Sequence, residues 1–421
     1  MKVFKFGGAS VKNTDAVKNV GAILSLYPGE KIVIVVSAMG KTTNKLEEIV
    51  AALQAKNEKQ FNDLVDELYE YHQFILGELF NERHFKIFQI IDSIFEKLKL
   101  RIKDNFSDNY SFEYDQVVSL GEVLSSHILL EYLLEQAYKA TWLDARKLIR
   151  TDSNFQEGKV DWETTSKLVS SAFDEVLVNS DLVITQGFIG HTAEGFATTL
   201  GREGSDYTAG ILAYCGNAES VTIWKDVPGM LNADPKYFED TKKLEQISFK
   251  EAIELSYYGA SVIHPKTIKP LQNKNIPLYV KSFLDPIGSG TKIQAETNKD
   301  ELIPSFIIKQ KQLLISITPK DFSFIAEENL AVIFNILSLE QIKINLMQNS
   351  ALSFSILVDE NQEQLTRLLS HLAKDYTVKY NENLSLVTIR HYDDATIALV
   401  TKDKESILTQ KTRQTIRLVL Q

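Results

Sequence analysis

Residues 198–210 (TTLGREGSDYTAG) combine charged, hydroxyl and glycine residues in one short turn ahead of an apolar run. The planar guanidinium of Arg202 can bind a carboxylate through two parallel hydrogen bonds. Asp206 places an opposite charge four residues later, and the glycines of the turn allow a small molecule to approach the backbone closely. The segment therefore predicts a binding loop for a charged small molecule, with an ordinary polar surface loop as the alternative.

A lysine and two glycines stand together near the N-terminus. Lys5 lies two residues before Gly7-Gly8, at the end of the apolar segment Val3–Phe6. Two successive glycines can turn their backbone N–H groups toward a phosphate, and the lysine adds positive charge beside them. A transferred phosphoryl group spreads negative charge over its oxygens, so the pattern suits phosphoryl transfer. A strand-to-helix turn with a solvated lysine is the alternative.

Residues 35–44 (VVSAMGKTTN) contain Gly40-Lys41-Thr42, which invites comparison with a phosphate-binding P-loop. That loop requires a glycine five residues before Gly40, and the sequence has Val35 there. We therefore reject a P-loop at this position.

The composition limits the classes of partner. The 421 residues carry 46 Lys and Arg against 56 Asp and Glu, a net charge of −10, which argues against nucleic acid or an anionic membrane as partner. Cys215 is the only cysteine, so no disulfide can form within the chain, which fits a reducing compartment. No signal-peptide pattern is present, and apolar runs such as Ile32–Val36 are too short to span a bilayer. We expect a soluble cytoplasmic protein.

The elements that must position these residues alternate between strands and helices. Val3–Phe6 and Ile32–Val36 are short, rich in β-branched residues and bounded by turn signals, and residues 14–26 between them have helical character. This order predicts a parallel sheet, to which Leu182–Gln186 and Val221–Trp224 add further strands. Residues from about 45 to 112 are charged and periodic, which predicts a helical insertion.

Further along, 248–257 and 265–272 are predicted helices and Pro277–Val280 a predicted strand. The pattern changes after residues 285–305, which are rich in Gly, Pro and polar residues. The segments LLISIT, EENLAVIFNILSLEQ, IKINLMQ, LSFSILVD, ENQEQLTRLLSHLA and YTVKY then predict the order β-α-β-β-α-β, a split βαβ sandwich. A second, shorter set predicts strands at LSLVTI and TIALVT, a helix over about 405–411 and a strand at RLVLQ.

With the N-terminal segment VFKFGGAS, the loop TTLGREGSDYTAG resembles the aspartate kinase family, within the amino-acid kinase superfamily. The C-terminal element order and the segment INLMQNSA resemble a pair of ACT domains, the second abbreviated. The resemblance implies an α/β fold: an amino-acid kinase fold, mainly a parallel sheet sandwiched by helices, followed by α+β ACT domains. The expected ranges are 1–292 for the catalytic domain (helical insertion at about 45–112), 293–305 for a linker, 306–380 for the first ACT domain and 381–421 for the second.

Glu122, in SLGEVLSSHILLEYL, stands near the start of an apolar helix, where one acidic residue ordinarily interacts with the helix dipole. The resemblance gives it a different role, binding the substrate's α-ammonium while Arg202 binds its α-carboxylate. A serine and a threonine six residues apart, Ser37 and Thr43, would hold the substrate's side-chain carboxylate. The expected substrate-binding residues are Ser37, Thr43, Glu122, Arg202, Gly204 and Ser205.

The expected reaction is phosphorylation of L-aspartate by ATP to give ADP and 4-phospho-L-aspartate, the first step of lysine, threonine and methionine biosynthesis. The side-chain carboxylate of aspartate is ionised at neutral pH, so it needs no general base. Lys5 and Asp206 are the expected catalytic residues, with Asp206 orienting Lys5 or a neighbouring donor. No cluster has zinc-ligand spacing, so Mg²⁺ would arrive with ATP. The alternatives are a related amino-acid kinase and a non-catalytic or weakly active amino-acid sensor.

The segments WKDVPGMLNADPK (224–236) and YYGASVIHPKT (257–267) resemble the family's nucleotide-binding segments. Many members have a lysine at the place of Ser261, and several have an aromatic at Leu231 and an arginine at Lys236. His264 is expected to be a structural, hydrogen-bonded histidine. The residues that the resemblance assigns to ATP are Lys5, Phe6, Gly7, Gly8, Lys225, Asp226, Leu231, Lys236 and Ser261.

The ACT half is expected to bind a feedback amino acid, with lysine first and threonine second. The expected effector residues, Phe324, Ile325, Asn345 and Gln348, lie in a loop that feeds a helix and in the strand that follows. The effector's carboxylate would meet N–H groups at the helix start, and its ammonium the oxygen of Asn345. ACT modules usually pair between chains, so a homodimer or larger assembly is expected. An ACT pair kept only as a dimerisation surface is the alternative.

Overall fold

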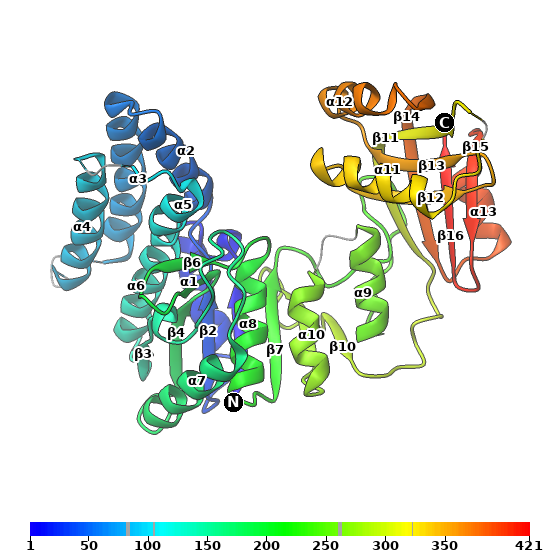
Figure 1. Ribbon diagram of the computed structural model, residues 1–421. Coiled ribbons are helices and arrows are strands. Elements are labelled where there is room, and N and C mark those ends of the chain that lie inside the picture. Colours follow the sequence, from blue (N-terminus) through cyan, green and yellow to red (C-terminus); the bar gives the residue numbers. More distant parts are fainter. Residues whose placement is uncertain (81–84, 104–105, 260–262, 322) are drawn as a thin grey trace. The chain divides into compact units, whose positions relative to one another are not determined.

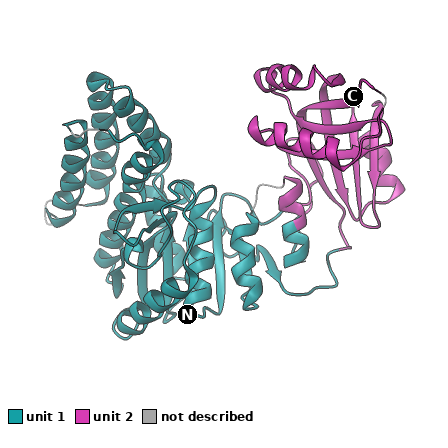
Figure 2. Ribbon diagram, viewed as in Figure 1, with its two compact units in different colours: residues 1–230, 243–253, 261–300 teal, residues 231–242, 254–260, 301–421 magenta. Residues whose placement is uncertain are grey.

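The computed structural model describes residues 1–80, 85–103, 106–259, 263–321 and 323–421. The chain divides into two compact units (Figure 2). The first comprises residues 1–230, 243–253 and 261–300, and the second comprises 231–242, 254–260 and 301–421. The two units are described separately below.

The first unit is built on an eight-stranded sheet in the order β3-β4-β2-β1-β7-β9-β10-β8. In this order, each pair of adjacent strands from β3 through β9 is parallel. The next strand, β10, pairs antiparallel with β9. The strand bounds are β1 (Lys2–Phe6), β2 (Ile32–Val36), β3 (Ala140–Trp142), β4 (Leu182–Gln186), β7 (Ser220–Lys225), β8 (Gln246–Ser248), β9 (Leu278–Ser282) and β10 (Thr291–Gln294). The predicted parallel sheet and each of its predicted strands are confirmed.

Helices cover both faces of this sheet (Figure 1). In β1, Phe4 and Phe6 point into the hydrophobic core that contains residues of α1 (Thr14–Leu24) and α6 (Leu120–Glu135). Alternate residues of a strand face opposite sides, so Lys5 points the other way, toward α8 (Gly204–Cys215). The same alternation that builds the core therefore places a lysine on the α8 face.

The remaining elements of the first unit connect or flank the sheet. α7 and α10 pack against α8, and β5 and β6 form a separate two-stranded sheet. α9 begins among residues of the first unit and ends among those of the second. Their bounds are η1 (Gly8–Val11), η4 (Ala145–Lys147), α7 (Trp162–Val176), β5 (Ile189–His191), β6 (Ala197–Thr199), α9 (Phe249–Tyr258) and α10 (Pro265–Asn273).

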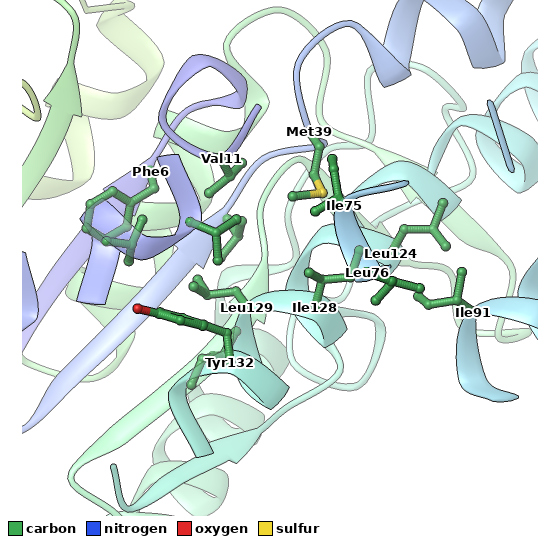
Figure 3. Close-up of a cluster of buried hydrophobic side chains, with 14 of the residues drawn as sticks. Phe6, Val11, Met39, Ile75, Leu76, Ile91, Leu124, Ile128, Leu129 and Tyr132 are labelled. Carbon is green, nitrogen blue, oxygen red and sulfur yellow. The ribbon is translucent and has the colours of Figure 1, made fainter. Parts of the chain in front are cut away.

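The predicted helical insertion is confirmed. It comprises α2 (Thr42–Gln54), α3 (Glu58–Leu79), α4 (Phe85–Leu100), η3 (Arg101–Lys103) and α5 (Tyr110–Val118). Its apolar residues pack into the core of the first unit: in Figure 3, Ile75 and Leu76 of α3 lie close to Leu124 and Ile128 of α6. The insertion thus extends the hydrophobic core.

One helical stretch, Tyr110–Glu135, is long and apolar enough to cross a membrane by length and composition alone. It is therefore longer than the apolar runs considered from the sequence. Its most apolar window is 67% buried inside the protein, and Ser119 separates its two helices, α5 and α6. That burial is typical of a core helix in a folded domain.

The second unit holds a six-stranded antiparallel sheet in the order β12-β13-β11-β14-β16-β15. Its longest strands, β11 (Ser305–Pro319) and β14 (Tyr376–Arg390), pair with each other along most of their lengths. The other elements are α11 (Glu327–Leu339), β12 (Ile344–Asn349), β13 (Phe354–Asp359), α12 (Gln362–Leu372), α13 (Asp394–Thr401), β15 (Ser406–Lys411) and β16 (Thr415–Leu420). The expected α+β class of this half and its order β-α-β-β-α-β are confirmed.

Two predicted elements near the C-terminus are wrong. The segment TIALVT belongs to helix α13, because Asp393 and Thr396 form a reciprocal capping box that starts a helix there. Residues 405–411, predicted as a helix, contain strand β15, which pairs antiparallel with β16. Tertiary pairing overrides local preference in this short segment.

Candidate active site

A cavity of about 560 Å³ lies where the carboxyl ends of β1, β2 and β7 meet the first turns of α2, α6 and α8. In open α/β sheets, ligands bind outside the carboxyl ends of the strands. All eight residues predicted to bind the substrate or act in catalysis line this cavity, although they are far apart in the sequence, and so does Lys225, which was predicted to bind ATP. These are Lys5, Ser37, Thr43, Glu122, Arg202, Gly204, Ser205, Asp206 and Lys225.

Two lysines share one buried carboxylate at one end of the cavity. Lys5 Nζ lies 2.7 Å from Asp206 Oδ1, and Lys225 Nζ lies 3.6 Å from Asp206 Oδ2. Burial alone would raise the pKa of Asp206, but the two ammonium groups lower it below its usual value. Asp206 is therefore a carboxylate that holds two cations in place, which agrees with an orienting role and not with a general base.

The Gly7-Gly8 turn lies directly beside the Lys5 ammonium. A Cβ atom on Gly7 would be 3.3 Å from Lys5 Nζ, and the Gly8 carbonyl accepts a hydrogen bond from Gly40 N–H at 3.0 Å. The Phe6 side chain, by contrast, is fully buried and stacks on Trp224 at 6.0 Å between ring centroids. Any contact of Phe6 with a nucleotide would have to come from its backbone.

Glu122 lies in the first turn of α6 and is only 3% exposed. Its Oε1 accepts a hydrogen bond from Ala38 N–H at 3.3 Å, whereas Oε2 has no hydrogen-bond partner among the described residues. Burial raises the pKa of Glu122 to about 8, and the hydrogen bond from Ala38 and the charge of Lys5 oppose that shift only partly. A cationic ligand would satisfy this carboxylate.

Arg202 and Glu203 form the turn that enters α8. The Arg202 side chain is exposed, and no carboxylate of the described residues lies within ion-pair distance of it. Glu203 has a left-handed backbone (φ 53°), and its buried Oε2 has no hydrogen-bond partner among the residues described. A left-handed non-glycine residue costs about 1–2 kcal/mol. The turn thus presents a free guanidinium and a strained acidic residue to the cavity, and no local pattern in the sequence indicates the strain.

Asp115 is a buried residue that the sequence reasoning missed. Its carboxylate accepts hydrogen bonds from Thr199 N–H (2.8 Å), Thr199 Oγ1 (2.7 Å) and Gln156 N–H (2.9 Å). Thr199 and Gln156 both line the cavity. Burial raises the pKa of Asp115 to about 6, although these hydrogen bonds lower it. Asp115 therefore positions two segments of the cavity wall, a role that no local pattern around position 115 indicates.

The other predicted nucleotide residues are not among those that line the cavity. Asp226 is exposed just after β7. Leu231 and Lys236 belong to the second unit, where Lys236 N–H donates to Asp234 Oδ1. Ser261 lies outside the described residues. Their assignment to ATP stays a prediction.

His264 has the expected structural role. Its side chain caps α10 by accepting a hydrogen bond from Lys266 N–H at 3.1 Å. Its pKa is lowered mainly by burial, against the charge of Glu203, which raises it.

The expected effector residues lie in the second unit. Phe324 is exposed, Ile325 is buried in the core beside α11, and Gln348 is exposed on β12. Asn345, also on β12, already uses its amide within the chain: Lys309 Nζ donates to its Oδ1 at 2.8 Å, and its Nδ2 donates to Gln312 and Asp359. The oxygen expected to accept an effector's ammonium therefore accepts the ammonium of Lys309.

The sequence and the structure were compared with known proteins, and both comparisons point to one family. The profile of the amino acid kinase family matches residues 1–282. The chain is 32% identical over 394 residues to lysine-sensitive aspartokinase 3 of Escherichia coli (strain K12), which covers 92% of this chain and 86% of that protein. The chain belongs to the amino acid kinase family, among the aspartokinases. Chloroplastic aspartokinase 2 of Arabidopsis thaliana is 29% identical to it over 412 residues, 92% of this chain and 73% of that protein.

Solved aspartokinase structures share the fold over the whole chain. The crystal structure of E. coli aspartokinase III in complex with aspartate and ADP (R-state) matches with a TM-score of 0.79 at 27% identity, covering 100% of this chain and 96% of that one. The same enzyme with lysine and aspartate (T-state) gives a TM-score of 0.81, covering 100% of this chain and 95% of that one. The expected resemblance to the aspartokinases is thereby confirmed, as is the predicted amino-acid kinase fold followed by ACT domains.

Proposed function

We propose that this aspartokinase transfers the γ-phosphoryl group of ATP to the side-chain carboxylate of L-aspartate, giving ADP and 4-phospho-L-aspartate. One observation carries the proposal: a single cavity places the Lys5–Asp206–Lys225 group together with the partly unsatisfied Glu122 and the free Arg202. The related E. coli enzyme has been crystallised with aspartate and ADP, which supports both substrates.

The amino-acid end of the cavity suits a zwitterion. Arg202 would bind the α-carboxylate through its planar guanidinium, and Glu122, once ionised, would bind the α-ammonium. Ser37 and Thr43 also line the cavity and can donate hydrogen bonds to the side-chain carboxylate. That carboxylate is ionised at neutral pH and is the nucleophile, so the protein contributes position and charge instead of proton transfer.

The cationic end of the cavity suits the phosphoryl group. Lys5 and Lys225 bring two positive charges, of which Asp206 neutralises one. Because Asp206 holds the Lys5 ammonium in place before the reaction, stabilising the developing charge on the phosphoryl oxygens needs little reorganisation.

We also propose that Mg²⁺ accompanies ATP. In the described ranges, no group of three or more His, Cys, Asp or Glu residues could hold a metal ion, so this part of the chain offers no cage of its own. Mg²⁺ usually keeps several waters and binds substrate phosphates with one or two carboxylates, which suits such a cavity. Bound there, it would neutralise phosphate charge.

Regulation and assembly extend the proposal to the second unit. Lysine is the proposed feedback effector, with threonine second, because the related E. coli aspartokinase is named lysine-sensitive and has been crystallised with lysine. An effector ammonium at the Asn345 oxygen would compete with Lys309, which already donates a hydrogen bond to it. We further propose a homodimer formed through the ACT half and a cytoplasmic location, which the single, buried Cys215 supports.

A hydroxamate assay tests the activity. With MgATP and aspartate, hydroxylamine should trap the acyl phosphate, and no signal should arise without aspartate. Equal or greater activity with glutamate would favour a different amino-acid kinase. A folded protein that binds lysine but yields no acyl phosphate would favour the amino-acid sensor instead.

A further inference from the structure

A second cavity lies in the first unit and is lined by residues of α8, α10, the start of α7 and the segment just before α7. Its volume is about 440 Å³, within the range of roughly 300–1,000 Å³ typical of small-molecule sites. The two helices approach closely at Gly210, where a Cβ atom would be 3.0 Å from the Thr267 carbonyl oxygen. Because of this close contact, residues of both α8 and α10 line the same cavity.

One wall of the cavity is aromatic. Tyr207 and Tyr214 are two turns apart on α8, so they lie on the same face of the helix, and Trp162 packs edge-on against them at 6.4 and 5.2 Å between ring centroids. Lys274 fixes Tyr214 from another side, with its Nζ 4.3 Å from the ring centroid. The partly buried rings are thus held in a fixed arrangement that can contact a flat group.

The lining also contains a group of lysines. Lys266 and Lys269 stand three residues apart on one face of α10, and Lys159 completes a group of three lysines around the cavity. None of the three has an ion-pair partner among the described residues, and Glu157 is the only acidic residue in the lining. The protein as a whole carries a net charge of −10, so this local excess of positive charge runs against its overall balance.

The side-chain donors of the aromatic wall are also unused. Neither tyrosine hydroxyl nor the Trp162 indole N–H donates to any residue that the structure describes. With the amide of Asn273, seven donor side chains, three of them charged, line a cavity whose described lining has one acidic side chain. The complement of such a lining is a ligand that combines a flat ring with an anionic group.

We propose that this second cavity binds a small planar anion, a ring that carries a phosphate or a carboxylate. The ring would lie against Tyr207, Tyr214 and Trp162, and the anionic group would meet Lys266 and Lys269. The site is distinct from the catalytic cavity, although Glu157 lines both. A ligand bound here would therefore lie beside a residue that also lines the catalytic cavity.

Isothermal titration calorimetry on the full-length protein tests this site directly. Saturating aspartate is added first and no nucleotide is included, because ADP is itself a ring that carries phosphate and would compete with the probes; the variants below assign the binding to the second cavity. Two probes then distinguish the source of the anionic group: uridine monophosphate for a ring with a phosphate, and indole-3-carboxylate for a ring with a carboxylate. We expect at least one of them to bind in a 1:1 ratio with a Kd below about 1 mM.

Variants and partial probes assign the binding to the named residues. Lys266→Glu combined with Lys269→Glu should weaken binding at least about tenfold, as should Tyr207→Ala, whereas Tyr207→Phe should retain it. Lys18→Glu, an exposed lysine on α1, is the matched control and should change nothing. Circular dichroism and Tm of each variant confirm folding.

Three results would overturn the proposal. The first is the absence of binding by both ring probes up to about 10 mM. The second is unchanged binding in the lysine double variant or in Tyr207→Ala. The third is inorganic phosphate binding as tightly as uridine monophosphate, because the rings would then contribute nothing. All three are read from binding alone, so they do not depend on whether the protein phosphorylates aspartate.

Discussion

The affinity for aspartate should rise with pH because of Glu122. Its carboxyl is buried and has a pKa of about 8 in the ligand-free protein, so it is mostly protonated at pH 7. Only the ionised form can pair with the substrate's ammonium. The apparent KM for aspartate is then the intrinsic value divided by the ionised fraction, which rises from about 9% at pH 7 to about 76% at pH 8.5. KM should therefore fall about eightfold over this interval.

The assay is acyl-phosphate formation at saturating MgATP, with aspartate varied at each pH. Glu122→Gln should have a high KM for aspartate that no longer depends on pH, while its KM for ATP stays near that of the wild type. Glu131→Gln, on the same helix but outside the cavity lining, is the matched control and should keep the wild-type pH profile. A wild-type KM that is flat between pH 7 and 8.5, or a Glu122→Gln profile with the wild-type slope, would refute the assignment.

Stability gives an independent check on the same group. The folded-state pKa of Glu122 is raised above its unfolded value, so between about pH 4.5 and 8 the folded protein holds a proton that the unfolded chain has lost. The contribution of this residue to folding stability therefore falls as pH rises through that window, by up to about 1.4 kcal/mol per pH unit. Glu122→Gln should gain Tm relative to the wild type as pH increases from 5 to 8. A Tm difference independent of pH would contradict the raised pKa.

Four further changes have defined outcomes. Lys5→Met should lower kcat about a hundredfold or more while ATP binding changes little, and near-normal turnover in the folded variant would exclude its role. Asp115→Ala leaves three donors without their acceptor and should cost about 3 kcal/mol or more in urea unfolding, and a loss under about 0.5 kcal/mol would show that water replaces it. Glu203→Gly removes a left-handed non-glycine residue and should stabilise the protein by about 1 kcal/mol, measured as Tm, and a lower Tm would mean the carboxylate has a hidden partner. Lys309→Met frees the Asn345 oxygen, so lysine should inhibit at lower concentration, and an unchanged inhibition curve would place the effector elsewhere.

The sequence supported the architecture wherever a local pattern was strong. Apolar β-branched segments such as Ile32–Val36 form the parallel strands, and the periodic insertion is helical. The predictions for two short C-terminal segments are wrong. A capping box at Asp393 makes TIALVT helical, and pairing with β16 makes the segment around 405–411 a strand. Lys5 and Asp206 are 201 positions apart, and only the family resemblance puts them in one site, since no spacing rule brings them within 2.7 Å.

Other features of the site depend on tertiary contacts that a sequence does not express. Asp115 holds the cavity wall through backbone groups of Thr199 and Gln156, and any residue type can supply a backbone N–H. Asn345 looked available as an acceptor, but its partner Lys309 lies on a neighbouring part of the same sheet, 36 residues away. The second cavity arises because α8 and α10 pack together at Gly210, and neither helix alone indicates it.

The charged residues of the catalytic cavity are of two kinds: those paired with an opposite charge of the protein and those without such a partner among the described residues. Lys5 and Lys225 are held by Asp206 before any substrate is present, so their positions are set by the protein. Glu122 Oε2 and the Arg202 guanidinium have no such partner among the described residues, and Glu122 remains largely protonated at neutral pH as a result. Leaving a buried carboxylate unsatisfied costs stability, whereas a ligand with one ammonium and one carboxylate would satisfy both groups at once. Under the proposed function, the paired charges would prepare the cavity for the phosphoryl group, and the unpaired ones would select an amino acid.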